Sequence, residues 1–216
     1  MPTRHRLEAD RQRLLQILRK SGIEDERTLA AMGAVPRERF VPIGQRHRAY
    51  EDSALGIERG QTISQPYIVA ATCVLLGLAG GERVLDVGTG SGYAACVLAE
   101  LAREVVTIER VPELAAAAAA ALARAGHPEV DVRVGDGSLG VPDRAPYDAV
   151  AVAAAAPSIP PALAAELATG GRLVVPRGTR QAQRLVLVER RDGELVERAS
   201  IPCRFVPLLG AAGFEE

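Results

Sequence analysis

Two acidic residues and a glycine-rich turn between them are the parts of the sequence best suited to bind a small molecule. Asp86 lies in an apolar run, and Gly88, Gly90 and Gly92 follow it at alternate positions. Glycine has no Cβ, so this turn can adopt positive φ and bring a ligand against bare backbone. The second acid, Glu109, ends the next apolar run and suits a ribose, because one carboxylate can accept from two hydroxyls. The pattern predicts a nucleoside site; the alternative is an ordinary turn with a solvated glutamate.

The spacing of the glycines narrows the choice of nucleoside ligand. G-x-G-x-G differs from the G-x-G-x-x-G of a dinucleotide-binding turn, and no Lys-Ser/Thr pair follows to make a phosphate-binding P-loop. Asp136 stands between two glycines after the following strand, where it could form a plain turn or accept a hydrogen bond from the exocyclic amine of a base. Glu109 on the ribose and Asp136 on the base fit S-adenosylmethionine, which has no pyrophosphate.

Alternating strands and helices must position these acids. Buried apolar runs predict a mostly parallel sheet with helices on both faces, and such α/β sheets bind ligands at the carboxyl ends of their strands. We expect strands at 83–87, 105–109, 130–134, 147–152 and 172–176, and helices at 93–101, 112–125 and 160–168. Two further β-like runs, at 184–189 and 194–205, are joined by a turn at 191–193 and predict antiparallel strands at the end of the sheet.

The chain before the glycine turn is expected to be mainly helical. Amphipathic patterns predict helices at 7–20 and 26–33, and Pro66 suits the first position of an apolar helix that runs to about Leu78. Residues 43–62 show no sustained periodicity, and a loop of that length is often a binding segment. We expect a single domain divided into a helical and loop cap, a cofactor-binding core, and a hairpin with a substrate-side tail (1–60, 61–180 and 181–216).

The composition limits the classes of function. The 216 residues carry a net charge of −1 with a pI near 6.3, which gives no electrostatic reason to expect a nucleic-acid partner. The N-terminus is charged without an apolar signal core, and no apolar run approaches the ~18 residues of a membrane span, so we expect a cytoplasmic protein. Cys73, Cys96 and Cys203 are widely spaced without a metal or redox pattern, so we interpret them as structural and expect no metal.

The end of the fourth strand indicates which group accepts the methyl, because it faces the sulfonium in sheets of this kind. It reads Ala-Ala-Ala-Ala-Pro-Ser over 153–158, with neither the Asn/Asp-Pro-Pro-aromatic element of amine methylation nor an acidic cluster for a metal. None of the three histidines (His5, His47 and His127) stands at a strand end of the site. A site without a base suits a carboxylate, which has a pKa of about 4 and is already ionised at pH 7.

Hydroxyl groups just before the helix at Pro66 could hold such a carboxylate. Thr62, Ile63 and Ser64 stand at the predicted helix N-terminus, where free N–H groups and the helix dipole favour an anion. One carboxylate oxygen would be held there while the other attacks, so that catalysis rests on alignment and exclusion of water. The simpler alternative is that Ser64 only caps the helix.

The same segments resemble the protein-L-isoaspartate O-methyltransferase family, in order and over nearly the whole chain. The Thr-Ile-Ser-Gln-Pro element is more specific than the glycine turn. The motifs are Val35-Pro-Arg-Glu-Arg-Phe-Val-Pro42, Ala49-Tyr-Glu-Asp52, Gly60-Gln-Thr-Ile-Ser-Gln-Pro66, Val84-Leu-Asp-Val-Gly-Thr-Gly-Ser-Gly-Tyr93, Gly135-Asp-Gly137, Ala145-Pro-Tyr-Asp148, Gly170-Gly-Arg-Leu-Val-Val-Pro176 and Phe205-Val-Pro-Leu208. Two departures, no Pro after Leu55 and Val141 in place of a frequent Trp, are expected near the entrance of the site, where they would alter peptide preference.

The resemblance implies a Rossmann-like class I S-adenosylmethionine-dependent methyltransferase. It implies methyl transfer to the α-carboxylate of L-isoaspartyl residues in aged proteins and peptides, after which the ester collapses to a succinimide that reopens partly to aspartate. No metal is implied, and we expect a monomer without a nucleic-acid or membrane partner.

The resemblance also implies roles for individual residues. Ser64 would be the active-site serine, Gly88 and Gly90 would hold the methionine part of the cofactor, Glu109 the ribose, and Asp136 with Gly137 the adenine. Further residues expected to bind the cofactor are Gln61, Thr62, Ile63, Asp86, Thr89 and Arg110. Residues expected to bind the substrate are Thr62, Ile63, Ser64, Val206 and Leu208, the last two from a segment that would close over the peptide.

Three other functions are compatible with parts of this pattern. A related carboxyl methyltransferase could act on an aspartate of one dedicated peptide, although the lack of an added recognition domain favours general repair. A non-catalytic module would be expected to have lost Asp86, the glycines or Ser64. A nicotinamide oxidoreductase is disfavoured by the glycine spacing.

Overall fold

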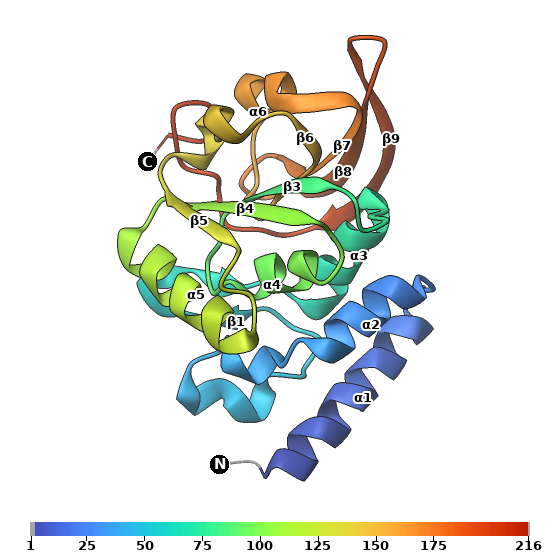
Figure 1. Cartoon of the computed structure of the whole chain (residues 1–216), viewed down its shortest axis with the longest axis vertical. Coiled ribbons are helices and arrows are strands. Elements are labelled where there is room, and N and C mark those ends of the chain that lie inside the picture. Colours follow the sequence, from blue (N-terminus) through green and yellow to red (C-terminus); the bar gives the residue numbers. More distant parts are fainter. Residues whose placement is uncertain (1–2, 216) are drawn as a thin grey trace.

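A seven-stranded sheet forms the centre of the protein, which a computed structural model describes over residues 3–215 (Figure 1). The strand order is β5-β4-β3-β6-β7-β8-β9. The pairs among β5, β4, β3, β6 and β7 are parallel, and β8 and β9 join antiparallel. The strands are β3 (Arg83–Val87), β4 (Glu104–Glu109), β5 (Asp131–Val134), β6 (Tyr147–Val152), β7 (Leu167–Gly178), β8 (Gln183–Arg191) and β9 (Glu194–Cys203). The predicted α/β sheet with a terminal antiparallel hairpin is confirmed.

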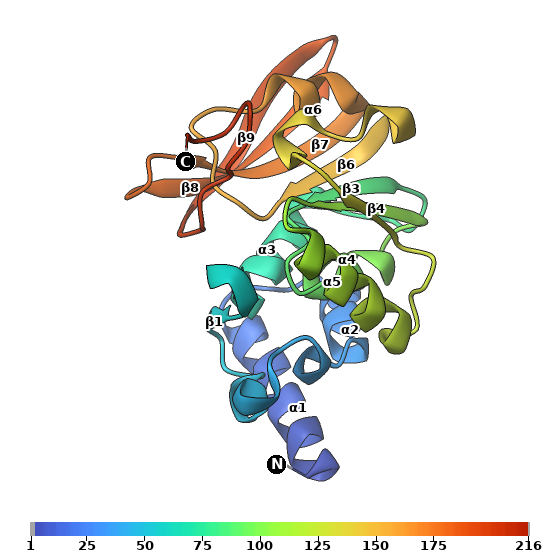
Figure 2. The ribbon, with the colours of Figure 1, turned by 90° about the vertical axis from the view of Figure 1, so that its left-hand side faces the viewer.

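Helices cover both faces of the sheet. On one face lie α3 (Pro66–Leu76), α4 (Tyr93–Ala99) and α5 (Pro112–Ala125), with α1 (Arg4–Lys20) and α2 (Glu26–Ala34) beyond them; α6 (Pro161–Glu166) lies on the other (Figures 1 and 2). Strand residues alternate between two buried clusters: Val84 packs toward α1–α5, whereas Leu85 packs toward α6. The central strands are mainly apolar because both faces are covered, and Asp86 and Thr107 are buried polar exceptions.

Local sequence explains where most helices begin and end. Asp25 caps α2 by accepting from the backbone N–H of Thr28 at 3.0 Å. The alanine-rich α5 starts at Pro112 and ends at Gly126 in the left-handed conformation, so its predicted bounds are confirmed. The predicted helix at 160–168 is too long, because Leu167 already pairs with Tyr147 as the first residue of β7.

The segment before the glycine turn has little regular structure. Short 3₁₀ turns span Ile43–Arg48 and Glu58–Gly60, and β1 (Leu55–Gly56) pairs antiparallel with β2 (Thr62–Ile63). Over residues 43–62 the prediction of no sustained periodic element is confirmed. This segment enters α3 at Ser64 and Gln65, so the fold places it beside the carboxyl ends of β3 and β4. Over the residues the structure describes, no helix is both long enough and apolar enough to cross a membrane.

Candidate active site

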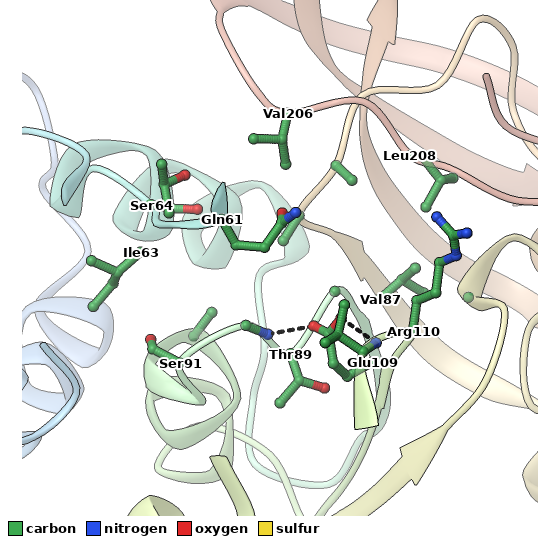
Figure 3. A pocket seen from close by; sticks show the side chains of 18 of the residues that line it. Gln61, Ile63, Ser64, Val87, Thr89, Ser91, Glu109, Arg110, Val206 and Leu208 are labelled. Atoms are coloured by element: carbon green, nitrogen blue, oxygen red, sulfur yellow. Dashed lines mark hydrogen bonds between the residues drawn. The ribbon is translucent and has the colours of Figure 1, made fainter. Parts of the chain in front are cut away.

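A cavity opens at the carboxyl ends of β3 and β4, where the sequence places the glycine turn (Figure 3). We call it the main cavity; its empty volume is about 890 Å³, part of it open to solvent. Predicted site residues that line it are Gln61, Thr62, Ile63, Ser64, Gly88, Thr89, Gly90, Glu109, Arg110, Gly137, Val206 and Leu208.

The glycines shape the floor of the main cavity. Gly88 has φ +97° and Gly90 φ +53°, conformations that side chains of L-residues disfavour. The N–H of Gly88 donates to the carbonyl of Ile108 at 2.9 Å, which ties the turn to β4. A Cβ on Gly137 would lie 2.6 Å from Cγ1 of Val87, so only glycine leaves this wall open. These positions form a cradle that side chains would fill.

Glu109 lies at the edge of the cradle with both carboxylate oxygens held by backbone. Its Oε2 accepts from the N–H of Gly90 at 2.8 Å, and Oε1 accepts from the N–H of Val111 at 3.0 Å (Figure 3). Only 7% of the residue is exposed. Each carboxylate oxygen can still accept a second hydrogen bond, so this fixed carboxylate is suited to a diol.

Asp86 is buried beside the main cavity rather than in its wall. Its Oδ2 accepts from the hydroxyl of Thr107 at 2.8 Å, and Thr107 in turn contacts the hydroxyl of Thr89 at 2.6 Å. Oδ1 has no hydrogen-bond partner among the described residues, and burial raises the pKa of Asp86 to about 7. Asp86 lines a small adjoining space, the inner cavity, together with Ser64.

Asp136 faces the C-terminal segment. Its carboxylate accepts from the N–H and hydroxyl of Ser138 at 2.9 and 2.7 Å, and from the N–H of Ala211 at 2.7 Å. Burial alone would raise the pKa of Asp136, but these hydrogen bonds lower it. Gly137 lines the main cavity and Asp136 does not. The structure therefore brings Glu109 and Gly137 together and gives Asp136 a role in holding the tail.

Ser64 lies at the junction of three cavities. It lines the main cavity, the inner cavity and an open groove. We define the groove by its lining, which is Ala54, Thr62, Ser64, Gln65, Tyr67, Ile68, Pro202, Cys203, Arg204, Phe205 and Val206. Figure 3 shows Ser64 and Val206 on the same side of the main cavity, with Glu109 and Arg110 across from them. A molecule in the groove would thus meet a molecule in the main cavity at Ser64.

The N-terminus of α3 does not offer the free N–H groups that the sequence suggested. Pro66 has none, Tyr67 donates to Oδ1 of Asp52 at 2.8 Å, and the N–H groups of Ile68 and Val69 donate to the carbonyl of Gln65. Asp52 thus caps α3 from a distant loop and places a negative charge there. The expectation that helix amides hold an anion was wrong for these four positions, and the hydroxyls of Thr62 and Ser64 remain as candidate donors.

The remaining candidates lie where they serve structure. His127 bonds Glu129 and Glu100, each at 2.9 Å, in a surface turn. Val141 is buried in the core near α6 and lines none of the three cavities, so its expected place at the entrance was wrong. Among the described residues, no group of three or more His, Cys, Asp or Glu is arranged to hold a metal ion.

Two parts of the site had no signal in the sequence. Tyr93 lines the main cavity although it reads only as a helix start, and Phe205 lines both the inner cavity and the groove. Both contacts depend on packing between distant segments.

Comparison with known proteins gives one consistent result. Residues 9–213 match the family described as protein-L-isoaspartate(D-aspartate) O-methyltransferase. A protein-L-isoaspartate O-methyltransferase 2 of Marinobacter nauticus is 55% identical over 195 residues, which cover 89% of each chain. A protein-L-isoaspartate O-methyltransferase 1 of Rhodopseudomonas palustris is 54% identical over 209 residues, covering 95% of this chain and 85% of that one.

Comparison with solved structures also finds protein-L-isoaspartate O-methyltransferases. One protein-L-isoaspartate O-methyltransferase superimposes with a TM-score of 0.84 at 31% identity, over 94% of this chain and 67% of that one. A candidate enzyme of the same name from Plasmodium falciparum, in complex with S-adenosyl-L-homocysteine, gives a TM-score of 0.80 at 25% identity, over 92% of this chain and 98% of that one.

Proposed function

The chain belongs to the protein-L-isoaspartate(D-aspartate) O-methyltransferase family, and from that premise we infer how its site works. The protein transfers a methyl group from S-adenosylmethionine to the free α-carboxylate of L-isoaspartyl residues in proteins and peptides. The family implies that this ester starts repair through a succinimide. The observation that carries the proposed site is the position of Ser64, where the open groove meets the main cavity.

The residues of the main cavity fit S-adenosylmethionine. Glu109 presents a fixed carboxylate with unused acceptor capacity for the ribose hydroxyls. Gly88, Gly90 and Gly137 leave room against bare backbone for the methionine and adenine parts. Asp86 borders the inner cavity and not the main cavity, and its Oδ1 has no partner among the described residues, so its expected cofactor contact stays a prediction. The further assigned contacts are Gln61, Thr62, Ile63, Thr89 and Arg110, each of which lines the main cavity.

The reaction requires little acid–base chemistry from the protein. When bound, the cofactor supplies an electrophilic methyl group on a sulfonium. The substrate carboxylate is ionised at neutral pH, so no described residue has to remove a proton. We propose that the Ser64 hydroxyl donates to one carboxylate oxygen and so aims the other at the methyl group. Val206 and Leu208, on the rim of the main cavity, exclude water from the two reactants.

The groove suits a peptide in an extended conformation. It is lined by Tyr67 and Ile68 of α3, by the segment Pro202–Val206, and by Thr62 and Ser64. We propose that Thr62, Ile63, Ser64, Val206 and Leu208 form the substrate side. We also propose that the protein acts as a monomer.

The test is methyl transfer from labelled S-adenosylmethionine to paired peptides that differ only in L-isoaspartyl or L-aspartyl at one position. We expect a base-labile ester on the isoaspartyl peptide alone. Ser64→Ala should lower kcat/KM by about 100-fold, the usual scale for losing one donor that aligns a reacting oxygen. Ser158→Ala is the matched control, because Ser158 is exposed and lines none of the three cavities.

The outcomes separate the alternatives. Activity on neither peptide, with tight S-adenosylhomocysteine binding intact, would point to a dedicated substrate. Unchanged turnover of Ser64→Ala would remove Ser64 from the site.

A further inference from the structure

We propose that Arg37 is a positioning residue for the reaction. Its buried guanidinium donates a hydrogen bond to the backbone carbonyl of Ser64 and so fixes the hydroxyl that aligns the substrate carboxylate. This inference rests on the proposed role of Ser64. It adds a residue that touches neither the cofactor cavity nor the groove, since Arg37 lines neither.

Arg37 uses its fork of N–H groups on three separate backbone carbonyls. Nε donates to the carbonyl of Ala49 at 2.7 Å, one terminal nitrogen to that of Ser64 at 3.0 Å, and the other to that of Ser53 at 3.3 Å. The residue is 0% exposed. It is one of the largest fully buried side chains among the described residues. A single side chain thus joins the start, the middle and the end of the irregular segment 49–64.

The charge of Arg37 has no carboxylate partner within ion-pair distance among the described residues. Its guanidinium carbon lies 4.9 Å from the centre of the Tyr93 ring, and burial lowers the pKa of Arg37. Burying an unpaired cation costs free energy that an apolar side chain would avoid. We therefore infer that Arg37 fixes the backbone geometry of segment 49–64 and does not act on stability alone.

The segment that carries Ser64 depends on these side-chain hydrogen bonds, because it contains little regular secondary structure to fix its backbone. Its only strand pairing, β1 with β2, joins Leu55 to Ile63 and Gly56 to Thr62. Immediately after Ser64 the chain is held by Asp52, whose carboxylate accepts hydrogen bonds from the Gln65 side chain at 3.0 Å and from the N–H of Tyr67. Arg37 and Asp52 therefore fix the backbone at the carbonyl of Ser64 and at the N–H of Tyr67, directly after the Ser64 side chain.

Arg37 also connects the two halves of the site. The ring on which it stacks, Tyr93, lines the main cavity at the start of α4, and Phe40 packs edge-on against the same ring at 5.8 Å. Lysine could not replace it, because three donors on one nitrogen cannot span three carbonyls in different directions. A misplacement of about 1 Å can cost about 100-fold in rate when catalysis depends on alignment.

The experiment is a double-mutant cycle between Arg37→Lys and Ser64→Ala. Rates are expressed per S-adenosylhomocysteine-binding site, measured by calorimetry, so that unfolded protein does not count. We expect Arg37→Lys to lower kcat/KM by about 10- to 100-fold, mostly through kcat, with S-adenosylhomocysteine affinity changed less than about 3-fold. In the Ser64→Ala background the same change should cost less than about 3-fold, because the group it positions is gone.

Three controls keep the cycle interpretable. Arg39→Lys is the matched control: Arg39 is exposed and its side chain reaches only the carbonyl of Arg124. Leu163→Ala, in the core near α6, reports what lost stability alone does to kcat per site. Arg37→Gln has no buried charge and therefore avoids the cost of desolvating one. This variant replaces Arg37→Lys in the cycle if the lysine variant does not fold.

The outcomes distinguish this inference from the proposed function. Additive losses in the cycle, or a loss of cofactor affinity that matches the loss of kcat/KM, would overturn the role of Arg37 and leave that of Ser64 intact. Full activity of Ser64→Ala would overturn the assignment of Ser64, and the inference with it.

Discussion

The two halves of the active site are held in place by different means. The cofactor half sits on the sheet: β3 is paired with β4 and β6 along its length, and the glycine turn is tied to β4 by backbone hydrogen bonds. Ser64 of the substrate half sits on segment 49–65, which also carries the assigned cofactor contacts Gln61, Thr62 and Ile63, and where strand pairing covers two residues on each side. There the backbone is fixed by two side chains, Arg37 and Asp52.

The difference teaches which changes each half tolerates. Backbone pairing in a sheet does not depend on any one side chain, so the cofactor half should lose function only through groups that contact the ligand. The substrate half depends on single side chains outside its cavities. A change there should lower turnover while cofactor binding stays intact.

The largest expected effect tests the cofactor half. Glu109→Ala removes the carboxylate that we assign to the ribose and frees the N–H groups of Gly90 and Val111. Charge-assisted hydrogen bonds are worth about 1.5–3 kcal/mol each, so S-adenosylhomocysteine affinity measured by calorimetry should fall by about 100-fold or more. Glu113→Ala is the control, because Glu113 is exposed and pairs with Arg59 at 2.6 Å. Wild-type affinity in Glu109→Ala would contradict the ribose assignment.

The same contrast explains what the sequence could predict. The strands and α5 follow from apolar periodicity, Pro112 and Gly126, which are local signals. The glycine turn with Glu109 was predictable because neighbouring parallel strands end at the same edge of a sheet. The family resemblance, the α/β fold and the function are confirmed by the comparisons. The division into 1–60, 61–180 and 181–216 and the individual ligand contacts stay predictions.

The remaining features could not be predicted because their partners come from distant parts of the chain. Asp52 caps α3 from 15 residues away, and Asp136 bonds Ala211 from 75 residues away. Neither pairing leaves a pattern in the sequence. The amides of α3 were therefore expected to hold an anion although they already have partners in the fold, whereas the assignment of Asp136 to the base stays a prediction.

A second variant tests the substrate half. Asp52→Ala removes the carboxylate that accepts from the Gln65 side chain and from the N–H of Tyr67. Loss of a helix cap costs about 1 kcal/mol, so the melting temperature should fall by a few degrees. If the cap also fixes Ser64, kcat should fall by about 10-fold, with S-adenosylhomocysteine affinity unchanged. Glu51→Ala is the matched control, since Glu51 is exposed and pairs with Arg48 at 2.9 Å. An unchanged kcat with the same loss of stability would show that the cap serves only α3.

The choice of peptide should respond least to mutation, and it depends on the charge that lines the groove. Of the described residues that line the groove, Arg204 alone is charged, and it is exposed. An isoaspartyl peptide with Glu beside the damaged residue should therefore have a higher kcat/KM than the same peptide with Lys. Exposed charge pairs are worth up to about 1 kcal/mol, so Arg204→Glu should reverse this preference by about threefold to tenfold. Arg103→Glu, a reversal at the amino end of β4, should leave the ratio unchanged. Added salt should reduce the preference, because the interaction is screened over a few ångströms. A ratio that neither Arg204→Glu nor salt alters would show that the groove selects its peptide by shape alone.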